Sequence, residues 1–330
     1  MADDTIQRTD PLIWLRRQSR WSVFEIAFWL ATLVPFFLFP TYLSLASQIA
    51  ITALFAVSVD LILGYAGIIT LGHAMFFGIG AYTAGLLTTV GWGEPLTGLA
   101  AAAAVAGLAG YVVSFMIVRV HHLALIMITL GLGLLTVELA NSMHWLTGGA
   151  DGLQGIDAWP IFNTFEFDLW GYTAYGYALA ALFAGVLISR RLVHSPFGLT
   201  LRGIRENITR MPAIGAPHRF RLQKVFTISC AMAGVAGALL AQTTETVSLE
   251  SLGFQRSADV VVMLILGGTG RLYGAIVGAV IFMVARDQLS DVNPQYWYFW
   301  IGLLLMGVVM FMPDGILGGL MRLTQSWRRP

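Results

Sequence analysis

The chain has 330 residues, of which 57% are hydrophobic and 11% are charged, and its mean hydropathy is +0.74. A soluble domain carries about a quarter charged residues, so this composition argues against a single water-soluble core. The net charge of +1 gives no reason to expect nucleic acid as a partner. The single cysteine, Cys230, excludes a disulfide framework and a cysteine metal site.

Ten apolar segments follow one another along the chain, and roughly 20 apolar residues are enough to cross the hydrocarbon core as a helix. A polar N-tail, residues 1–21, precedes them without the pattern of a cleaved signal, so the first segment is expected to be retained. The segments are expected at about 22–39, 42–63, 73–90, 96–118, 122–140, 169–189, 225–243, 257–268, 273–286 and 295–312. The eighth and ninth are short, which predicts broken or re-entrant helices that protein or a cavity covers. The predicted fold is an all-α, polytopic membrane helix bundle of about ten transmembrane or re-entrant helices.

The distribution of lysine and arginine predicts that both tails are cytoplasmic. The N-tail holds four basic residues, the loop 190–224 holds eight and the C-tail, residues 317–330, holds three, which makes 15 of the 19 in the chain. The loop 141–168 carries acidic residues and no basic one, and is expected outside. The transmembrane domain is therefore assigned to residues 22–316, with 190–224 as its large cytoplasmic loop.

Ionisable side chains inside apolar runs are candidates for a solute path, because inserting them costs about 2.5–3.5 kcal/mol each. A helix-end position that reaches the interface remains an equal alternative for His73 and Asp259. Asp60 and Glu138 lie within otherwise apolar runs, which favours a functional role. The candidates are Asp60, His73, Glu138 with Asn141 three residues later, and Asp259.

Glycine-rich stretches lie beside these residues. Glycine permits unwound backbone, whose exposed N–H and C=O groups suit a zwitterion, so the stretch 63–85 is predicted to line the path or its gate. Residues 63–67 (LGYAG) resemble residues 266–270 (LGGTG), and both are expected at the cytoplasmic end. Tight helix packing is the alternative role. The glycines assigned to the path are Gly64, Gly67, Gly72, Gly267 and Gly268.

The cytoplasmic loop 190–224 contains an expected amphipathic helix at 199–211. Its apolar face is formed by Leu201, Ile204 and Ile208. Arg202, Arg205, Glu206 and Arg210 take the other face, and Pro212, Gly215 and Pro217 end the helix. Such a helix suits docking to a soluble partner and, equally, binding to anionic lipid headgroups.

Enzyme motifs do not occur in the sequence. The single lysine, Lys224, follows Gln223, so there is no GxxxxGK[ST] loop for ATP, and no HExxH occurs. No catalytic residue, metal site or cofactor is expected in this chain. A proton-coupled secondary transporter that uses Asp60 and Glu138 is the main rival class, while a membrane-embedded enzyme is disfavoured because no nucleophile–base pair is visible.

Four sequence blocks resemble the permease subunits of branched-chain amino-acid ABC transporters, together with the similar urea and amide permeases. The blocks are 61–87, 146–156, 195–215 and 258–282, and MPDGILG at 312–318 also fits. Their order and spacing cover nearly the whole chain.

The resemblance implies a channel-forming subunit of an ATP-driven importer in the bacterial inner membrane. Branched-chain amino acids are the first expectation for the solute, and urea or amides the alternative. The implied partners are a second homologous permease, two cytoplasmic ATPases that hold ATP-Mg, a periplasmic or lipid-anchored binding protein, and membrane lipid. Segment 195–215 matches the ATPase-coupling loop, with Arg202, Arg205, Glu206, Arg210 and Gly215 as its contact residues, although Ile208 replaces the usual acidic residue. Asp151 is expected to face the binding protein.

Overall fold

The protein is an α-helical bundle with almost no sheet. The computed structural model describes residues 23–120, 123–161, 164–166, 168, 171–213, 215–312 and 314–319. The predicted N-tail therefore lies outside the described residues, as does all of the predicted C-tail after residue 319. The helices are α2 (Val23–Ala31), α3 (Val34–Leu38), α4 (Leu43–Asp60), α5 (Ala74–Thr89), α6 (Pro95–Ile117), α7 (Leu123–Ser142), α8 (His144–Thr147), α9 (Tyr172–Val193), α10 (Pro196–Glu206), α11 (Arg210–Ala213), α12 (His218–Thr244), α13 (Phe254–Gly267), α14 (Leu272–Val292) and α15 (Trp297–Phe311). Short turns and strands join them: η1 (Pro40–Tyr42), η2 (Leu61–Tyr65), η3 (Gly149–Asp151), η4 (Leu249–Leu252), β1 (Leu153–Gln154) and β2 (Thr246–Val247).

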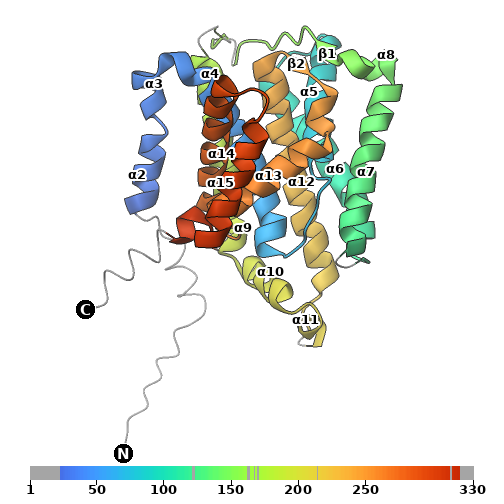
Figure 1. The fold of residues 1–330 in the computed structure, drawn as a ribbon. Helices are drawn as coiled ribbons and strands as arrows, with labels where there is room; N and C mark the ends of the chain where they lie inside the picture. Colours follow the sequence, from blue (N-terminus) through green and yellow to red (C-terminus); the bar gives the residue numbers. More distant parts are fainter. Residues whose placement is uncertain are drawn as a thin grey trace, which may run out of the picture.

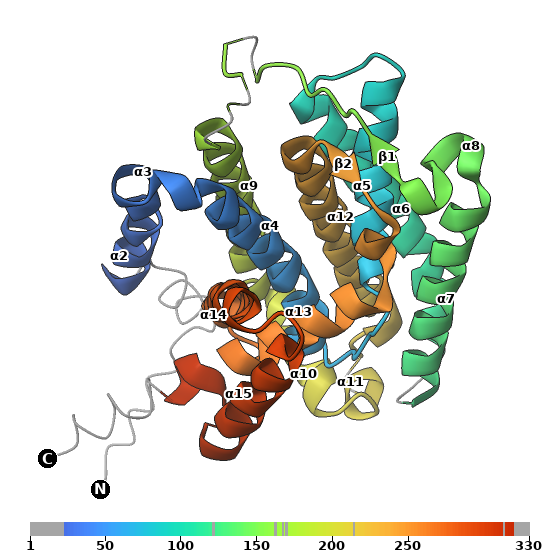
Figure 2. The same ribbon diagram turned by 45° about the horizontal axis from the view of Figure 1, so that its top comes forward.

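Within the described part of the chain, seven helices are long and apolar enough to cross a membrane, which agrees with the predicted polytopic bundle. The helices α4 and α12 form the centre, since 78% and 72% of their apolar windows are buried, against 22% for α7 and 18% for the last helix. Figure 2 shows α2 and α3 on one side of the bundle and α7 on the other, with α4 and α12 between them. The exposed apolar faces of α7 and α15 suit contact with lipid or another membrane helix.

The two ends of the bundle are different in structure (Figure 1). One end carries α10 and α11, and we call it the α10 end. The opposite end carries α8 and the antiparallel pair β1–β2, in which Leu153 faces Val247, and we call it the hairpin end. An ion pair between Glu25 of α2 and Arg190 of α9, at 2.6 Å, ties the first described turn to the helix that leads into α10. The first described helix therefore starts at the α10 end.

Two half-length helices meet near the middle of the bundle. The backbone N–H of Ala74, at the start of α5, donates to Oγ of Ser257 in the first turn of α13, at 2.9 Å. From there α5 runs to the hairpin end, where Gly85 lies against Leu153 and Ile156. Helix α13 runs the other way, to the α10 end. Each half-helix is preceded by irregular backbone, which a membrane tolerates only where protein or a cavity covers it.

Similar short sequences precede the two half-helices, which run in opposite directions. Thr70-Leu71-Gly72 lies just before α5, and Ser251-Leu252-Gly253 lies just before α13. Helices that are interrupted in opposite directions are the usual plan of membrane transport proteins. The similar stretches 63–67 and 266–270 were expected at the same end, and both lie at the α10 end and touch each other there.

Three predicted segments differ from the observed helices. Segment 22–39 is divided into α2 and α3, because Pro35 cannot continue a helix that begins four or more residues earlier. Segment 73–90 is the 16-residue α5, shorter than a full crossing. Segment 273–286 was predicted to be short, and this was wrong: α14 has 21 residues. Its polar end, with Arg286 and Asp287, lines a cavity and so does not need to be apolar.

Candidate functional site

The α10 end of the bundle is closed by a contact between two turns. The π-helical turn η2 follows α4, and residues 268–271 join α13 to α14. The carboxylate of Asp60 accepts a hydrogen bond from the backbone N–H of Gly270 at 2.7 Å, and its side chain is fully buried. Gly270 has φ +76°, a left-handed conformation that favours glycine. Two segments distant in the sequence are thereby held together at this end.

Helix α10 lies outside the bundle on this end, and its bounds follow from local capping. The side chain of Ser195 accepts from the N–H of Gly198 at 3.4 Å, with Pro196 in the first turn, so the helix starts earlier than the predicted residue 199. It also ends earlier, at Glu206. Asn207 turns the chain, because its Oδ1 accepts from the N–H groups of Thr209 and Arg210 at 3.1 and 3.0 Å. The predicted helix 199–211 is therefore two helices, α10 and α11.

The polar face of α10 contacts the turn that closes the bundle. A guanidinium N–H of Arg205 donates a hydrogen bond to the carbonyl oxygen of Gly64. One helical turn earlier, the guanidinium of Arg202 lies over the ring of Tyr65, 5.4 Å from its centre. The structure thus brings together residues that the sequence assigned to two different sites, the coupling loop and the path.

The other predicted coupling residues lie away from the bundle. Glu206 and Arg210 are exposed, whereas Leu201 and Ile204 of the opposite face are buried and Ile208 is half-buried. Gly215 has φ +79° and open space around its Cα. The α10–α11 segment therefore has one face on the bundle and one face free.

The predicted path glycines at this end are positions of close backbone approach. Gly67 has φ +74° and lies against the side chain of Arg205. Gly267 lies where α13 crosses α14, and a Cβ there would meet the backbone of Gly274 and Gly278. Gly268, with φ +105°, lies against the backbone of Asp314. Helix and turn packing therefore accounts for these glycines, and their contact with solute stays a prediction.

His73 lies at the middle of the bundle and is fully buried. Its Nε2 is 3.0 Å from Oγ of Ser229, whose hydroxyl donates to the carbonyl oxygen of Ser58 at 2.5 Å. The Ser229 oxygen must then accept from His73, which assigns the proton to Nε2. Phe55, Phe76 and Phe226 surround the imidazole ring, and the preceding Gly72 lies against the backbone of Thr129 in α7.

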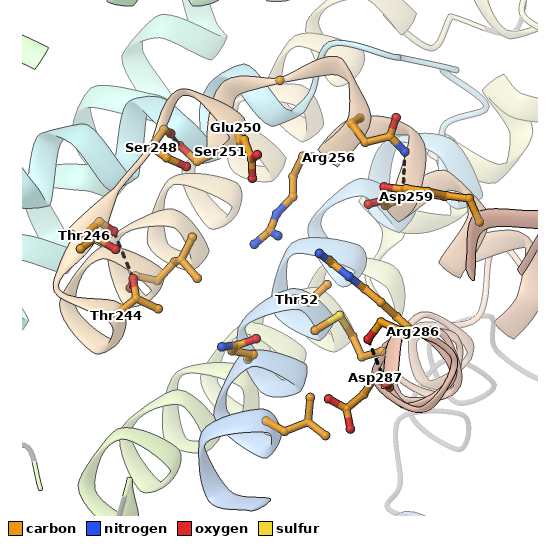
Figure 3. Close-up of a pocket in the computed structure, with 18 of the residues that line it drawn as sticks. Thr52, Thr244, Thr246, Ser248, Glu250, Ser251, Arg256, Asp259, Arg286 and Asp287 are labelled. Atoms are coloured by element: carbon orange, nitrogen blue, oxygen red, sulfur yellow. Dashed lines mark hydrogen bonds between the residues drawn. The ribbon is translucent and has the colours of Figure 1, made fainter. Parts of the chain in front are cut away.

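A cavity of about 680 Å³ lies in the half of the bundle near the hairpin end (Figure 3). Five helices line it: α4, α12, α13, α14 and α15. Asp259, one of the predicted path residues, is on its wall and accepts a hydrogen bond from the side chain of Gln255 at 3.0 Å. The remaining charged residues on the wall are Glu250, Arg256, Arg286 and Asp287.

Three predicted residues lie apart from this cavity and from the α10 end. Glu138 is exposed on α7, and Asn141 is half-buried at the end of the same helix. Asp151 is exposed in η3, beside the β1–β2 pair at the hairpin end. The structure does not bring Glu138 together with Asp60, although the sequence placed both in one path.

The cavity arginines were not predicted from the sequence. Arg256 and Asp259 are three residues apart in a helix, which places them on the same side of α13, and this spacing was a usable signal. Arg286 and Asp287 lie where the predicted ninth segment, 273–286, ends, and the structure continues α14 beyond them to Val292. A charged pair that follows an apolar run is ambiguous, because a helix end and a cavity wall produce the same pattern.

Comparison with known proteins identifies the family. The family model described as "Branched-chain amino acid transport system / permease component" matches residues 41–310. The high-affinity branched-chain amino acid transport system permease protein LivM of Escherichia coli K12 is 30% identical over 316 residues, which cover 87% of this chain and 72% of that protein. The permease protein LivH of the same organism is 24% identical over 281 residues, covering 81% of this chain and 91% of that protein. No solved structure matches the chain. The chain is a multi-pass membrane protein that belongs to the family of permease components of branched-chain amino acid transport systems.

Proposed function

We propose that this chain is the channel-forming permease subunit of an ATP-driven importer for branched-chain amino acids in the bacterial inner membrane. The names of the similar proteins support the solute, since both LivM and LivH are branched-chain amino acid permeases. That the chain resembles two such proteins also supports a pair of homologous permeases as the working unit. The ATP-Mg sites belong to two partner ATPases in this proposal, because the chain has no P-loop lysine.

The observation that carries the proposal is the position of Arg205. This residue belongs to α10, outside the bundle, yet it bonds to the carbonyl oxygen of Gly64 in the turn that closes the α10 end. A partner that binds the exposed face of α10 and moves this helix would therefore also move η2, the turn that closes the α10 end. Coupling of ATPase closure to a permease gate needs such a mechanical link between a surface helix and the path.

The mechanism follows from the difference between the two ends. A cavity of about 680 Å³ near the hairpin end and the contact between Asp60 and Gly270 at the α10 end support an outward-open, inward-closed state in this proposal. ATP binding would move α10, and Arg205 would draw η2 away from Gly270. The link from Asp60 to Gly270 would then break, and the path would open to the cytoplasm.

The hairpin end would receive the binding protein. Asp151 is exposed there, and the β1–β2 pair holds the loop 141–168 close to the end of α12. The delivered solute would enter the cavity below it. Both tails and α10 would face the cytoplasm, as the positive charges of the sequence predict.

The test is affinity purification of the tagged chain in mild detergent, followed by mass spectrometry of the proteins recovered with it. We expect a second permease and a P-loop ATPase with the wild-type chain. The double charge reversal Glu206→Arg with Arg210→Glu should remove the ATPase and keep the second permease. The matched control, Asp151→Arg at the other end, should keep both.

A proton-coupled carrier would give the opposite result. The chain would then be recovered without an ATPase, and uptake of leucine into vesicles would stop when the proton gradient is dissipated. Retention of the ATPase by the charge-reversed chain would show that the free face of α10 is not its docking surface.

A further inference from the structure

Two arginine side chains point into the hairpin-end cavity from two different helices (Figure 3). Arg256 extends from the first turn of α13, and Arg286 extends from α14. The guanidinium of Arg256 lies over the ring of Phe77, 5.0 Å from its centre, and that of Arg286 lies over the ring of Trp297 at 5.2 Å. An aromatic face orients a guanidinium and leaves its N–H groups free at the edges.

These N–H groups have no carboxylate partner among the described residues. The single ion pair there with an N–O distance within 4.0 Å is that between Arg190 and Glu25, at the α10 end. The Nε of Arg256 is buried without a hydrogen-bond partner. The charge of Arg286 opposes that of Arg256, and the carboxylates of Asp259 and Glu250 partly offset this repulsion from beyond ion-pair distance. An anionic group bound between two like charges that face a cavity would stabilise both of them further.

Acidic residues lie on the same wall but beyond ion-pair distance. Asp259 is held by Gln255, and Glu250 and Asp287 are the remaining acids of the cavity. The cavity therefore offers separate positive and negative groups around one space. Apolar side chains complete the wall, among them Leu45, Leu240 and Met283. This combination fits a small solute that carries a carboxylate, an ammonium group and an aliphatic part.

We propose that Arg256 and Arg286 form a subsite that binds the carboxylate of the transported solute, with the acidic residues of the same wall facing its ammonium group. The inference rests on the proposed transport function and adds the residues that select the solute. Bidentate hydrogen bonds from guanidinium to carboxylate are among the strongest polar contacts in proteins. Urea and neutral amides lack a carboxylate and would leave both arginines unpaired, so the subsite favours an amino acid over those solutes.

The experiment uses the complete transporter, with both permeases, the ATPases and the binding protein, in proteoliposomes. Radiolabelled L-leucine is the first probe and radiolabelled urea the second. The variants are Arg256→Gln and Arg286→Gln. The matched control is Arg191→Gln, because Arg191 is exposed on α9 and is not part of the cavity wall. Each variant is also assayed for recovery of its partner subunits and for ATP hydrolysis.

We expect each cavity variant to lower the initial rate of L-leucine uptake by roughly 10-fold to 100-fold, with normal recovery of partners and continued ATP hydrolysis. The control should transport like the wild type. Wild-type uptake rates in both cavity variants would overturn the subsite and leave the transport function intact. Loss of the second permease from either variant would overturn it too, because the arginines would then be interface residues. ATP-driven uptake of urea without uptake of L-leucine would refute the carboxylate subsite and the proposed solute together, and would leave only ATP-driven import intact.

A second measurement needs no substitution. In the wild-type transporter, phenylglyoxal should modify Arg256 and Arg286, and L-leucine delivered by the binding protein should protect both, as read by peptide mass spectrometry. Modification that L-leucine leaves unchanged would contradict the proposal even if the variants failed to assemble. Failure of the wild-type transporter to take up any solute with ATP would instead refute the proposed function on which the subsite depends.

Discussion

The two ends of the bundle satisfy their charges in different ways. At the α10 end, Asp60 and Arg205 each bond to the backbone of a glycine, and Gly64 lies against the backbone of Gly270, with a pocket of about 390 Å³ beside Gly67 and Arg205. In the cavity near the hairpin end, Arg256 and Arg286 have no carboxylate partner among the described residues, and about 680 Å³ is open beside them. The charged side chains of the α10 end therefore bond to backbone of this chain, although Oδ2 of Asp60 is buried without a partner, whereas the cavity arginines bond to no carboxylate among the described residues. We therefore expect added side-chain volume to lower the stability of the α10 end, and removal of an arginine charge to lower solute uptake through the cavity near the hairpin end.

The largest effect is expected from added volume at the closed end. A Cβ on Gly267 would lie 2.6 Å from the carbonyl carbon of Gly274 and 2.9 Å from the N of Gly278, so Gly267→Val would force α13 away from α14. Because the obstacle is backbone and cannot move aside, we expect a loss of about 3 kcal/mol in stability. The thermal unfolding midpoint in detergent measures it. Gly302→Val in α15 is the control, since no other atom lies within 4 Å of the added Cβ. Equal midpoints for the two variants would contradict the close crossing.

The next largest effect is expected from loss of the hydrogen bond between Asp60 and Gly270, which holds the α10 end closed. Asp60→Ala removes the acceptor of the Gly270 N–H and should cost about 2 kcal/mol, because a buried donor is left unpaired. Asp60→Asn keeps an acceptor oxygen of the same shape. We expect the alanine variant to leak preloaded L-leucine from proteoliposomes without ATP and the asparagine variant to retain it. Retention by both variants would mean that other contacts close the α10 end.

Breaking the link between α10 and η2 should have a smaller and more specific effect. Arg205→Ala removes the hydrogen bond to the carbonyl oxygen of Gly64, and it also removes the charge of Arg205, which is exposed, while Glu206 and Arg210 stay in place. We expect L-leucine uptake to fall about tenfold while ATP hydrolysis continues, which corresponds to about 1.4 kcal/mol of lost coupling. Arg205→Lys, which keeps a charged donor, should recover part of the uptake. A parallel loss of ATP hydrolysis would indicate that Arg205 contacts the ATPase instead.

The sequence predicted the helical bundle because apolar length is a direct physical requirement of the membrane. It also predicted an amphipathic helix in 190–224, since Leu201 and Ile204 follow the helical period and are buried in the structure. The short helix at 257–268 was predicted and is confirmed by the 14 residues of α13, whereas the short length of α5 was not predicted. Residues 66–73 and 245–253 are not α-helical, which a membrane tolerates only where protein or a cavity covers them, and this cover depends on neighbours that are distant in the sequence.

The candidate site was predicted less completely for the same reason. Asp60 and Arg205 were each singled out, but their meeting at one turn depends on how α10 folds back under α4. Arg256 and Arg286 are 30 positions apart in the chain, and no local pattern indicates that they share a cavity. Conversely, Glu138 looked internal because its neighbours are apolar, although it lies on the exposed face of α7. Apolar neighbours do not distinguish a buried helix from one that faces lipid or another subunit.

The smallest effect is expected from the exposed charge of Asp151 at the hairpin end. Asp151 is exposed beside the β1–β2 pair, so Asp151→Asn removes a charge that water already screens. A rim charge mainly changes the rate of association, and we expect the apparent affinity for the binding protein to fall less than about tenfold. Surface-bound transporter and free binding protein give the rate directly, and the difference from wild type should vanish at high salt. Glu206→Gln, at the opposite end, should leave this rate unchanged. If Glu206→Gln slowed binding as much as Asp151→Asn does, the slower binding would reflect the net charge of the transporter and would give no support to a docking role for Asp151. The comparison between the two ends would then have to rest on the cavity and the closed turn alone.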